Sequence, residues 1–246
     1  MPPQHADIAD NLMRVRRRLD AAAQRAGRDA SSITLVAVSK TFPPESVRAA
    51  AAGGQRVFGE NRVQEAAAKI DALADLGLEW HLIGHLQSNK ARKAVAVFPW
   101  IESVDSLPLL ERLDASAAGA PTRPSILIQV DLAREASKHG ADEAATRPLV
   151  SAAAAARHLD LRGLMIVPPY PENPEDSRPW FRRLRALRDH LVSEGLPADR
   201  LRELSMGMSH DFEVAIEEGA TLVRVGTAIF GQRPPVAPAS AEPAVP

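Results

Sequence analysis

The sequence predicts a single (β/α)8 barrel with an extra amino-terminal helix, and three observations support this fold class. Short apolar runs alternate strictly with helical stretches, which implies a parallel sheet. Eight such strands fit a chain of 246 residues, and a closed barrel of this kind takes about 250. The motifs G-x-G-x-x-G and G-x-x-x-x-G-K-[ST] do not occur, so the open nucleotide-binding sheets lose their main signature.

The first element is an amphipathic helix near the amino terminus. Ile8, Leu12, Val15 and Leu19 recur at the spacing of one helical face, and they predict a helix that buries this stripe. Gly27 follows the stripe and is typical of a residue that ends a helix.

Eight strand candidates follow, each of them a short apolar run: Ile33–Ser39, Val57–Gly59, Trp80–Gly84, Trp100–Ser103, Ser125–Val130, Leu161–Val167, Glu203–Met206 and Thr221–Val225. Seven helical stretches lie between them: Pro44–Ala52, Val63–Leu76, Ser88–Val97, Leu107–Ala118, Asp142–His158, Ser177–Glu194 and Asp211–Glu218. No break in composition divides residues 1–232, so we expect one domain there. Residues 233–246 are rich in Pro and Ala without apolar periodicity, and they predict a disordered tail.

Composition and charge exclude several classes of protein. Lys+Arg number 30 and Asp+Glu 31, a formal charge of −1, whereas binders of nucleic acid or membrane surfaces usually carry a basic excess. The chain has no cysteine, which excludes disulfides, thiol nucleophiles and cysteine-ligated metals. No segment approaches the roughly 18 apolar residues of a membrane span, and the start lacks the apolar core of a signal peptide. We therefore expect a cytoplasmic protein without nucleic-acid or membrane partners.

Candidate site residues lie where strands end, because barrels of this class build their sites at the carboxyl ends of their strands. Lys40 directly follows the first long apolar run, and none of the other four lysines has such a position. An amine in an apolar pocket has a lowered pKa and forms Schiff bases with carbonyl compounds. The alternative is a strand-end lysine that simply reaches solvent.

Small and hydroxylated residues follow the seventh and eighth strands. Ser205 and Ser209 lie in the first of these segments, and Ser209 is a natural N-cap for the next helix, where free N–H groups bind anions. Gly226 and Thr227 follow the last strand, and glycine lets backbone approach a ligand closely. Plain capped turns would give the same pattern. An amine opposite a phosphate site suggests a phosphorylated carbonyl compound, and pyridoxal 5′-phosphate carries both groups.

Other polar side chains are candidates for contacts to such a ligand. Arg224 lies two residues before Gly226; it either forms a buried structural ion pair or faces the ring nitrogen, where its charge would disfavour ring protonation. Asn61 and His85 follow the second and third strands and are candidates for hydrogen bonds to the ring hydroxyl. His81 and His85 also suggest a metal, but no H-E-x-x-H motif or nearby carboxylate cluster supports one, so we predict no metal site.

Six sequence blocks resemble the pyridoxal phosphate homeostasis protein family, whose members are small barrels related to the barrel domain of alanine racemase. The blocks run in order between Ile33 and Gly231: VAVSK, FGENRVQE, WHLIGHLQSNK, LRGLMIVPP, LSMGMSHDFEVAIEEGAT and VRVGTAIFG. The resemblance implies an alanine-racemase-like TIM barrel. It leaves the residues after Arg233 outside the family pattern.

The resemblance also implies a function and a set of contacts. It implies that Lys40 holds pyridoxal 5′-phosphate, a form of vitamin B6, as a Schiff base and that Arg224 faces the ring nitrogen. Phosphate contacts would come from Ser205–Ser209 and from Gly226 and Thr227. The family is regarded as binding the cofactor, delivering it to apo-enzymes and controlling its free level inside the cell, with indirect effects on amino and keto acid pools. No enzymatic turnover is firmly established for this family.

Two other functions use the same candidate residues. One is a weak pyridoxal phosphate-dependent amino-acid racemase, and the other is a cofactor-free aldolase that uses Lys40 on a phosphorylated sugar. In alanine racemase the second base is a tyrosine from a further domain of the partner subunit. This chain has no such domain and one tyrosine, Tyr170, in a proline-rich loop. Racemisation is therefore disfavoured, and without the dimer contact of that domain we expect a monomer.

Overall fold

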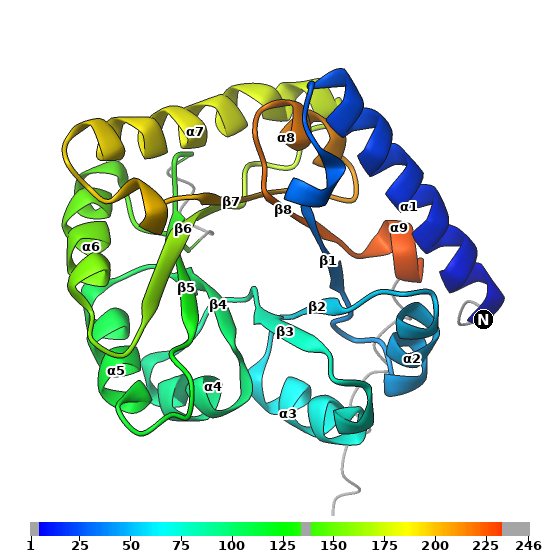
Figure 1. The fold of residues 1–246 in the computed structure, drawn as a ribbon, viewed down its shortest axis with the longest axis horizontal. Helices are drawn as coiled ribbons and strands as arrows, with labels where there is room; N and C mark the ends of the chain where they lie inside the picture. Colours follow the sequence, from blue (N-terminus) through cyan, green and yellow to red (C-terminus); the bar gives the residue numbers. More distant parts are fainter. Residues whose placement is uncertain (1–4, 134–138, 233–246) are drawn as a thin grey trace, which may run out of the picture.

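The computed structural model describes residues 5–133 and 139–232, which form a closed barrel of eight parallel strands (Figure 1). The strands follow one another around the barrel in chain order, and β8 pairs with β1 to close it. Helices form a ring outside the strands. The predicted (β/α)8 barrel is confirmed. The predicted tail, residues 233–246, lies outside the described residues.

The strands are β1 (Thr34–Val38), β2 (Val57–Glu60), β3 (Glu79–Leu82), β4 (Trp100–Val104), β5 (Ser125–Val130), β6 (Asp160–Ile166), β7 (Glu203–Met208) and β8 (Leu222–Val225). The α-helices are α1 (His5–Arg25), α2 (Pro44–Ala52), α3 (Val63–Ala72), α4 (Ala91–Val97), α5 (Leu107–Ala117), α6 (Glu143–Ala155), α7 (Arg178–Ser193), α8 (Phe212–Glu217) and α9 (Thr227–Phe230). Within the described ranges, none of these helices has the length and apolar character that a membrane crossing requires.

Most predicted boundaries agree with the structure to within three residues, and the exceptions lie at helix ends. The helix predicted over 63–76 is α3 followed by a 3-10 helix, η2 (Ala74–Leu76), which ends at Gly77 in a left-handed conformation with φ of 56°. The helix predicted over 88–97 begins as a 3-10 helix, η3 (Ser88–Lys90), before α4. The sequence does not predict α9, because its 4 residues are too few to show a helical period.

Helix α1 covers the side of the barrel where β8 meets β1. Its predicted stripe of Ile8, Leu12, Val15 and Leu19 is buried, with exposures of 0%, 0%, 1% and 5%. The helix packs against α2, α8 and α9 (Figure 1). Because α9 is so short, α1 occupies the place in the outer ring that a long helix after β8 would otherwise fill. The extra helix is therefore part of the barrel's core packing.

Apolar side chains fill the space between the strands and the outer helices, as in other barrels. The interior of the barrel is different, because it also holds buried charged and polar groups. Glu102 on β4, Ser205 on β7 and Arg224 on β8 are linked by hydrogen bonds across the interior and are 0–4% exposed. Buried charges of this kind need partners, and they point to a functional site.

Replacing Leu12 with alanine should lower the free energy of unfolding by about 2–5 kcal/mol, because truncating a fully buried leucine leaves a cavity. Urea unfolding followed by circular dichroism measures this loss. Met13→Ala is the matched control on the same helix, since Met13 is 49% exposed and its truncation should cost little. Equal losses in the two variants would contradict the packing role of α1.

Candidate functional site

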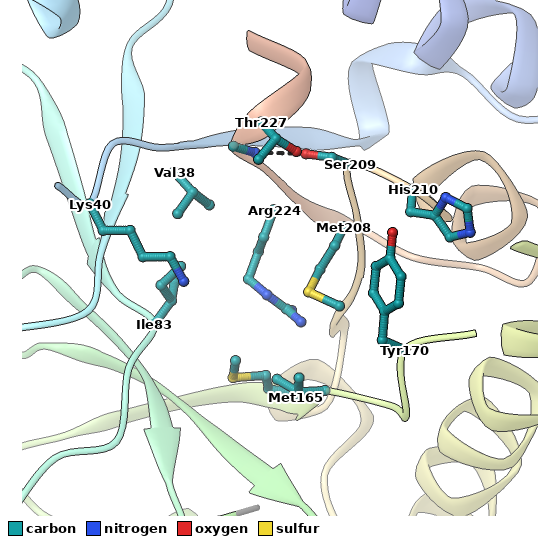
Figure 2. Close-up of a pocket in the computed structure, with 12 residues that line it drawn as sticks. Val38, Lys40, Ile83, Met165, Tyr170, Met208, Ser209, His210, Arg224 and Thr227 are labelled. Carbon is teal, nitrogen blue, oxygen red and sulfur yellow. Dashed lines mark hydrogen bonds between the residues drawn. The ribbon is translucent and has the colours of Figure 1, made fainter. Parts of the chain in front are cut away.

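A cavity of about 350 Å³ opens at the carboxyl ends of the barrel strands, a volume within the range of roughly 300–1,000 Å³ for small-molecule sites. Figure 2 shows the side chains that surround it. Its lining residues come from five strand ends and the loops after them: Val38, Lys40, Ile83, Met165, Val167, Tyr170, Met208, Ser209, His210, Arg224, Gly226 and Thr227. This is the end of the barrel at which the sequence predicts the site.

Lys40 lies two residues beyond β1, and its side chain extends into the cavity (Figure 2). Val38 and Ile83 flank it with apolar surface. The chain turns sharply after Lys40, because Thr41 has a φ of 69°, which side chains with a Cβ rarely adopt. The N–H of Thr41 donates to Oε1 of Glu65 at 3.0 Å, and this bond holds the turn. The backbone therefore fixes where the Lys40 amine enters the cavity.

A buried ion pair supports the backbone beside Lys40. The Lys69 amine donates to the Ser39 carbonyl at 2.9 Å and to Oε1 of Glu60 at 2.5 Å, while the Ser39 hydroxyl donates to the same Glu60 oxygen at 2.7 Å. Burial raises the pKa of Glu60, although the Lys69 charge and the two hydrogen bonds oppose the shift. Lys69 reads in the sequence as a lysine on a polar helix, yet it is 5% exposed. Its amine is engaged in the ion pair and does not line the cavity.

Arg224 points into the cavity from β8 (Figure 2). Two acceptors hold its guanidinium. One nitrogen donates to the Ser205 hydroxyl, and the other donates to the Ile166 carbonyl at 2.7 Å. Burial lowers the pKa of Arg224, while the charges of Glu102 and Asp211 oppose this shift; an arginine nevertheless stays charged in a protein. The arrangement presents a fixed, desolvated cation to any ligand in the cavity.

Ser205 does not line the cavity, although the sequence makes it a candidate phosphate contact. It is 0% exposed, and its hydroxyl donates to Glu102 while it accepts from Arg224. Side chains alternate along β7, so Ser205 faces the barrel interior below the cavity. Its hydroxyl joins Glu102 to Arg224 and so orients the guanidinium.

His81 and Glu102 continue this network away from the cavity. The two ring nitrogens of His81 face carboxylates, Glu102 at 2.6 Å and Glu79 at 3.1 Å. Burial lowers the pKa of His81, but the hydrogen bonds and charges of Glu102 and Glu79 outweigh burial and raise it overall. Burial likewise raises the pKa of Glu102, while His81, Arg224 and Ser205 together lower it overall. Glu102 is therefore a buried carboxylate that offsets the charge of Arg224.

The ends of β7 and β8 are joined by the Ser209 hydroxyl. It accepts from the N–H of Gly226 at 3.0 Å and from that of Ala228 at 3.3 Å. The prediction that Ser209 is the N-cap of the next helix is wrong, because the residue before α8 is Asp211. The Asp211 carboxylate accepts from the Met208 N–H and from the Ser177 hydroxyl, both at 2.7 Å. The extra residues of β7 place Ser209 against β8 instead.

Asn61 and His85 lie in a neighbouring hollow and do not line the cavity. Both border a separate depression after β2 and β3, together with Arg62 and Lys90. The backbones there are in close contact, since a Cβ at Gly84 would lie 2.3 Å from the Asn61 carbonyl oxygen. The structure thus brings together Lys40 and the candidate residues of β8, but it leaves these two candidates outside.

Several lining residues carry no sequence signal of their own. Val38 and Met165 read as ordinary strand residues, and Met208 and His210 read as part of the segment before a helix. Their common feature is position, since each lies at the carboxyl end of a strand or just beyond it. Tyr170 is 74% exposed, and its ring stacks on His210 with centroids 5.1 Å apart at the cavity rim.

The family comparison agrees with this fold. Residues 11–234 match the family model of the alanine racemase N-terminal domain. Alanine racemase from Corynebacterium glutamicum, at 21% sequence identity, superposes with a TM-score of 0.65 over 97% of this chain and 63% of that chain. The barrel is therefore of the alanine racemase N-terminal class.

Closer relatives narrow the class to one family. The pyridoxal phosphate homeostasis protein of Aquifex aeolicus is 46% identical over 227 residues, which cover 92% of this chain and 99% of that protein. The protein of that name from Escherichia coli K12 is 43% identical over 92% of this chain and 97% of its own length. PipY of Synechococcus elongatus, solved with pyridoxal phosphate bound, is 43% identical and superposes with a TM-score of 0.81, covering 91% of this chain and 100% of PipY. The chain belongs to the pyridoxal phosphate homeostasis protein family.

The His81 network should make the stability of the fold depend on pH. The pKa of His81 is raised above its ordinary value of 6.5, so the folded protein keeps this proton to higher pH than the unfolded chain does. The stabilisation is complete below about pH 6.5 and is lost as the pH rises through the folded pKa. Urea unfolding of the unmodified protein and His81→Gln should therefore give a stability difference that shrinks with rising pH.

His190→Gln is the control for this experiment, because its side chain is 65% exposed on α7. That variant should follow the unmodified protein at every pH. A stability difference for His81→Gln that stays constant from about pH 6 to pH 9 would show that His81 does not change its charge differently in the folded and unfolded states.

Proposed function

We propose that this protein binds pyridoxal 5′-phosphate as a Schiff base on Lys40 and acts in the homeostasis of that cofactor. The observation that carries the proposal is that one cavity holds the Lys40 amine, the buried Arg224 cation and the hydroxyls at the ends of β7 and β8. Relatives named for pyridoxal phosphate homeostasis and the ligand-bound PipY support it. When bound, the cofactor supplies an aldehyde that reacts with amines and a ring that can withdraw electrons.

The residues of the cavity match the chemical groups of the cofactor. The Lys40 nitrogen would attack the aldehyde carbon, form the C=N bond and release water. Hydroxyls of Ser209 and Thr227, and the backbone at Gly226, would bind the phosphate, a role that suits the cleft after the last two strands. Apolar surface from Val38 would contact the ring. We assign no cofactor contact to Asn61, His85 or Ser205, which lie outside the lining.

Arg224 favours storage of the cofactor over strongly carbanionic chemistry. A fixed cation at the ring nitrogen disfavours protonation of the ring and weakens its capacity to accept electrons. The guanidinium is held in place by Ser205 and the Ile166 carbonyl, so it would not move aside. Exposed Tyr170 and Thr227 leave the cavity mouth open to solvent, and a Schiff base can be hydrolysed there. Reversible capture followed by release suits a homeostasis role.

The protein would act in the cytoplasm as a monomer, hold pyridoxal phosphate without turning over a substrate of its own, and release it to apo-enzymes that need it. Effects on amino and keto acid pools would then be indirect, because they would arise from the enzymes that receive the cofactor.

One observation favours a second candidate, a weak amino-acid racemase. Tyr170 and His210 line the cavity together with Lys40 (Figure 2), so acid–base groups come from more than one side of it. Under the homeostasis proposal, racemase activity should stay below about 1 s⁻¹ and should not depend on Tyr170. Assays with single enantiomers of amino acids, on the unmodified protein and on Tyr170→Phe, measure this. Faster racemisation that is lost in Tyr170→Phe would establish the racemase instead.

The Schiff base itself can be tested by absorption. Purified protein saturated with pyridoxal phosphate should show a band near the boundary between visible and ultraviolet light, because a C=N bond conjugated to the ring absorbs there. Lys40→Ala should lose this band entirely, since no other lysine of the described residues lines the cavity. Lys93→Ala, which removes an exposed lysine on α4, should keep it. A protein that takes up no cofactor and stays colourless would overturn the proposal and favour the cofactor-free aldolase.

A further inference from the structure

Three metal-ligating side chains lie close together at the rim of the barrel, outside the cofactor cavity. His85, Asp105 and His139 each offer one ligand atom, and these atoms all lie within 4.8 Å of one another. Nδ1 of His85 is 3.1 Å from Oδ2 of Asp105. The rings of His85 and His139 stack with centroids 3.6 Å apart and planes 9° from parallel. None of the three residues lines the cofactor cavity.

The barrel holds these residues in place from three neighbouring strands. His85 follows β3 next to Gly84, whose carbonyl accepts from the Ser103 hydroxyl at 2.6 Å. Asp105 directly follows β4. The backbone of His139 is anchored to β5, because its carbonyl accepts from the Gln129 amide at 2.7 Å. His85 and Asp105 thus follow strand ends, which position ligands more accurately than free loops do, and one hydrogen bond ties the His139 backbone to β5.

We propose that His85, Asp105 and His139 form a binding site for a divalent transition-metal ion such as Zn²⁺. Bonds of about 2.0–2.1 Å to a tetrahedral ion place neighbouring ligand atoms about 3.3 Å apart. The 3.1 Å separation of the His85 nitrogen and the Asp105 oxygen matches this spacing. The His139 ligand atom lies within 4.8 Å of the others, so a shift of about 1.5 Å or less brings it to this spacing. The His139 ring must also turn out of its stack on His85, so that both nitrogens point at one ion.

The ligand types select the class of ion. Imidazole nitrogens favour zinc, nickel, copper and iron, whereas magnesium and calcium prefer sets made of oxygen alone. Two histidines and one carboxylate leave at least one coordination position for water or an added ligand. The side chains of His85 and Asp105 are 37% and 12% exposed, so an ion has a path from solvent. The proposal is independent of the proposed cofactor function, because the two sites share no residue.

A hydrogen bond between His85 and Asp105 accounts for only part of this arrangement. That bond does not require His139, yet the His139 ring lies against the His85 ring and brings a third ligand atom to the pair.

The test is a Zn²⁺ titration by isothermal calorimetry on the full chain, purified without a histidine tag, treated with chelator and dialysed. We expect one saturable site. His139→Ala and His85→Asn should each weaken it by about a hundredfold or more, since loss of a ligand costs at least as much as loss of an outer partner. His190→Ala on α7, whose side chain is 65% exposed, should bind Zn²⁺ as the unmodified protein does. Co²⁺ bound at this site should show the visible absorption bands of a tetrahedral ion.

Two controls keep the result interpretable. Circular dichroism and pyridoxal phosphate absorption should be unchanged in both ligand variants, so that loss of Zn²⁺ binding is not loss of the fold. His85→Asn is the milder change and serves if His139→Ala does not fold. The proposal is overturned if the unmodified protein shows no saturable Zn²⁺ binding below millimolar concentration. It is equally overturned if both ligand variants bind Zn²⁺ as tightly as the unmodified protein.

Discussion

The hydrogen-bonded pairing of β1 with β8 closes the barrel and brings the first and the last strand side by side. In this register Val36 lies opposite Arg224 and Ala37 opposite Val225. Lys40 and Gly226 therefore leave adjacent strands at the same end, and the cavity forms between them. Helix α1 covers this seam from outside. The site thus depends on a contact between residues nearly 190 positions apart, as the register of Val36 with Arg224 requires.

The chemistry of the cavity depends on how the barrel keeps a cation buried. A buried arginine is stable only where hydrogen-bond acceptors and an opposite charge replace the water that it loses. Ser205 and the Ile166 carbonyl supply the acceptors, and Glu102 supplies the charge. His81 in turn holds Glu102 as a carboxylate. The electrostatics at Arg224 are therefore set by residues on β3, β4 and β7 that do not line the cavity.

The sequence predicts the barrel and part of the site, because both follow from the periodicity of apolar residues and from which residues come directly after a strand. Strand–helix alternation defines the fold, and a lysine directly after an apolar strand marks Lys40. Other details depend on side-chain direction and on contacts between distant segments. Ser209 does not cap α8, because β7 is longer than its apolar run suggests. Lys69 reads as an exposed lysine in the sequence, because its ion pair with Glu60 forms only in the fold. The cluster around His139 has no short spacing that a motif could reveal.

We propose that the amine of Lys40, and no other lysine, captures the cofactor. Borohydride reduction of the protein with pyridoxal phosphate, followed by proteolysis and mass spectrometry, locates the modified lysine directly. We expect one cofactor per chain, attached at Lys40, with Lys69 unmodified inside its ion pair. Label spread over the surface lysines, or one cofactor attached at a lysine other than Lys40, would contradict it.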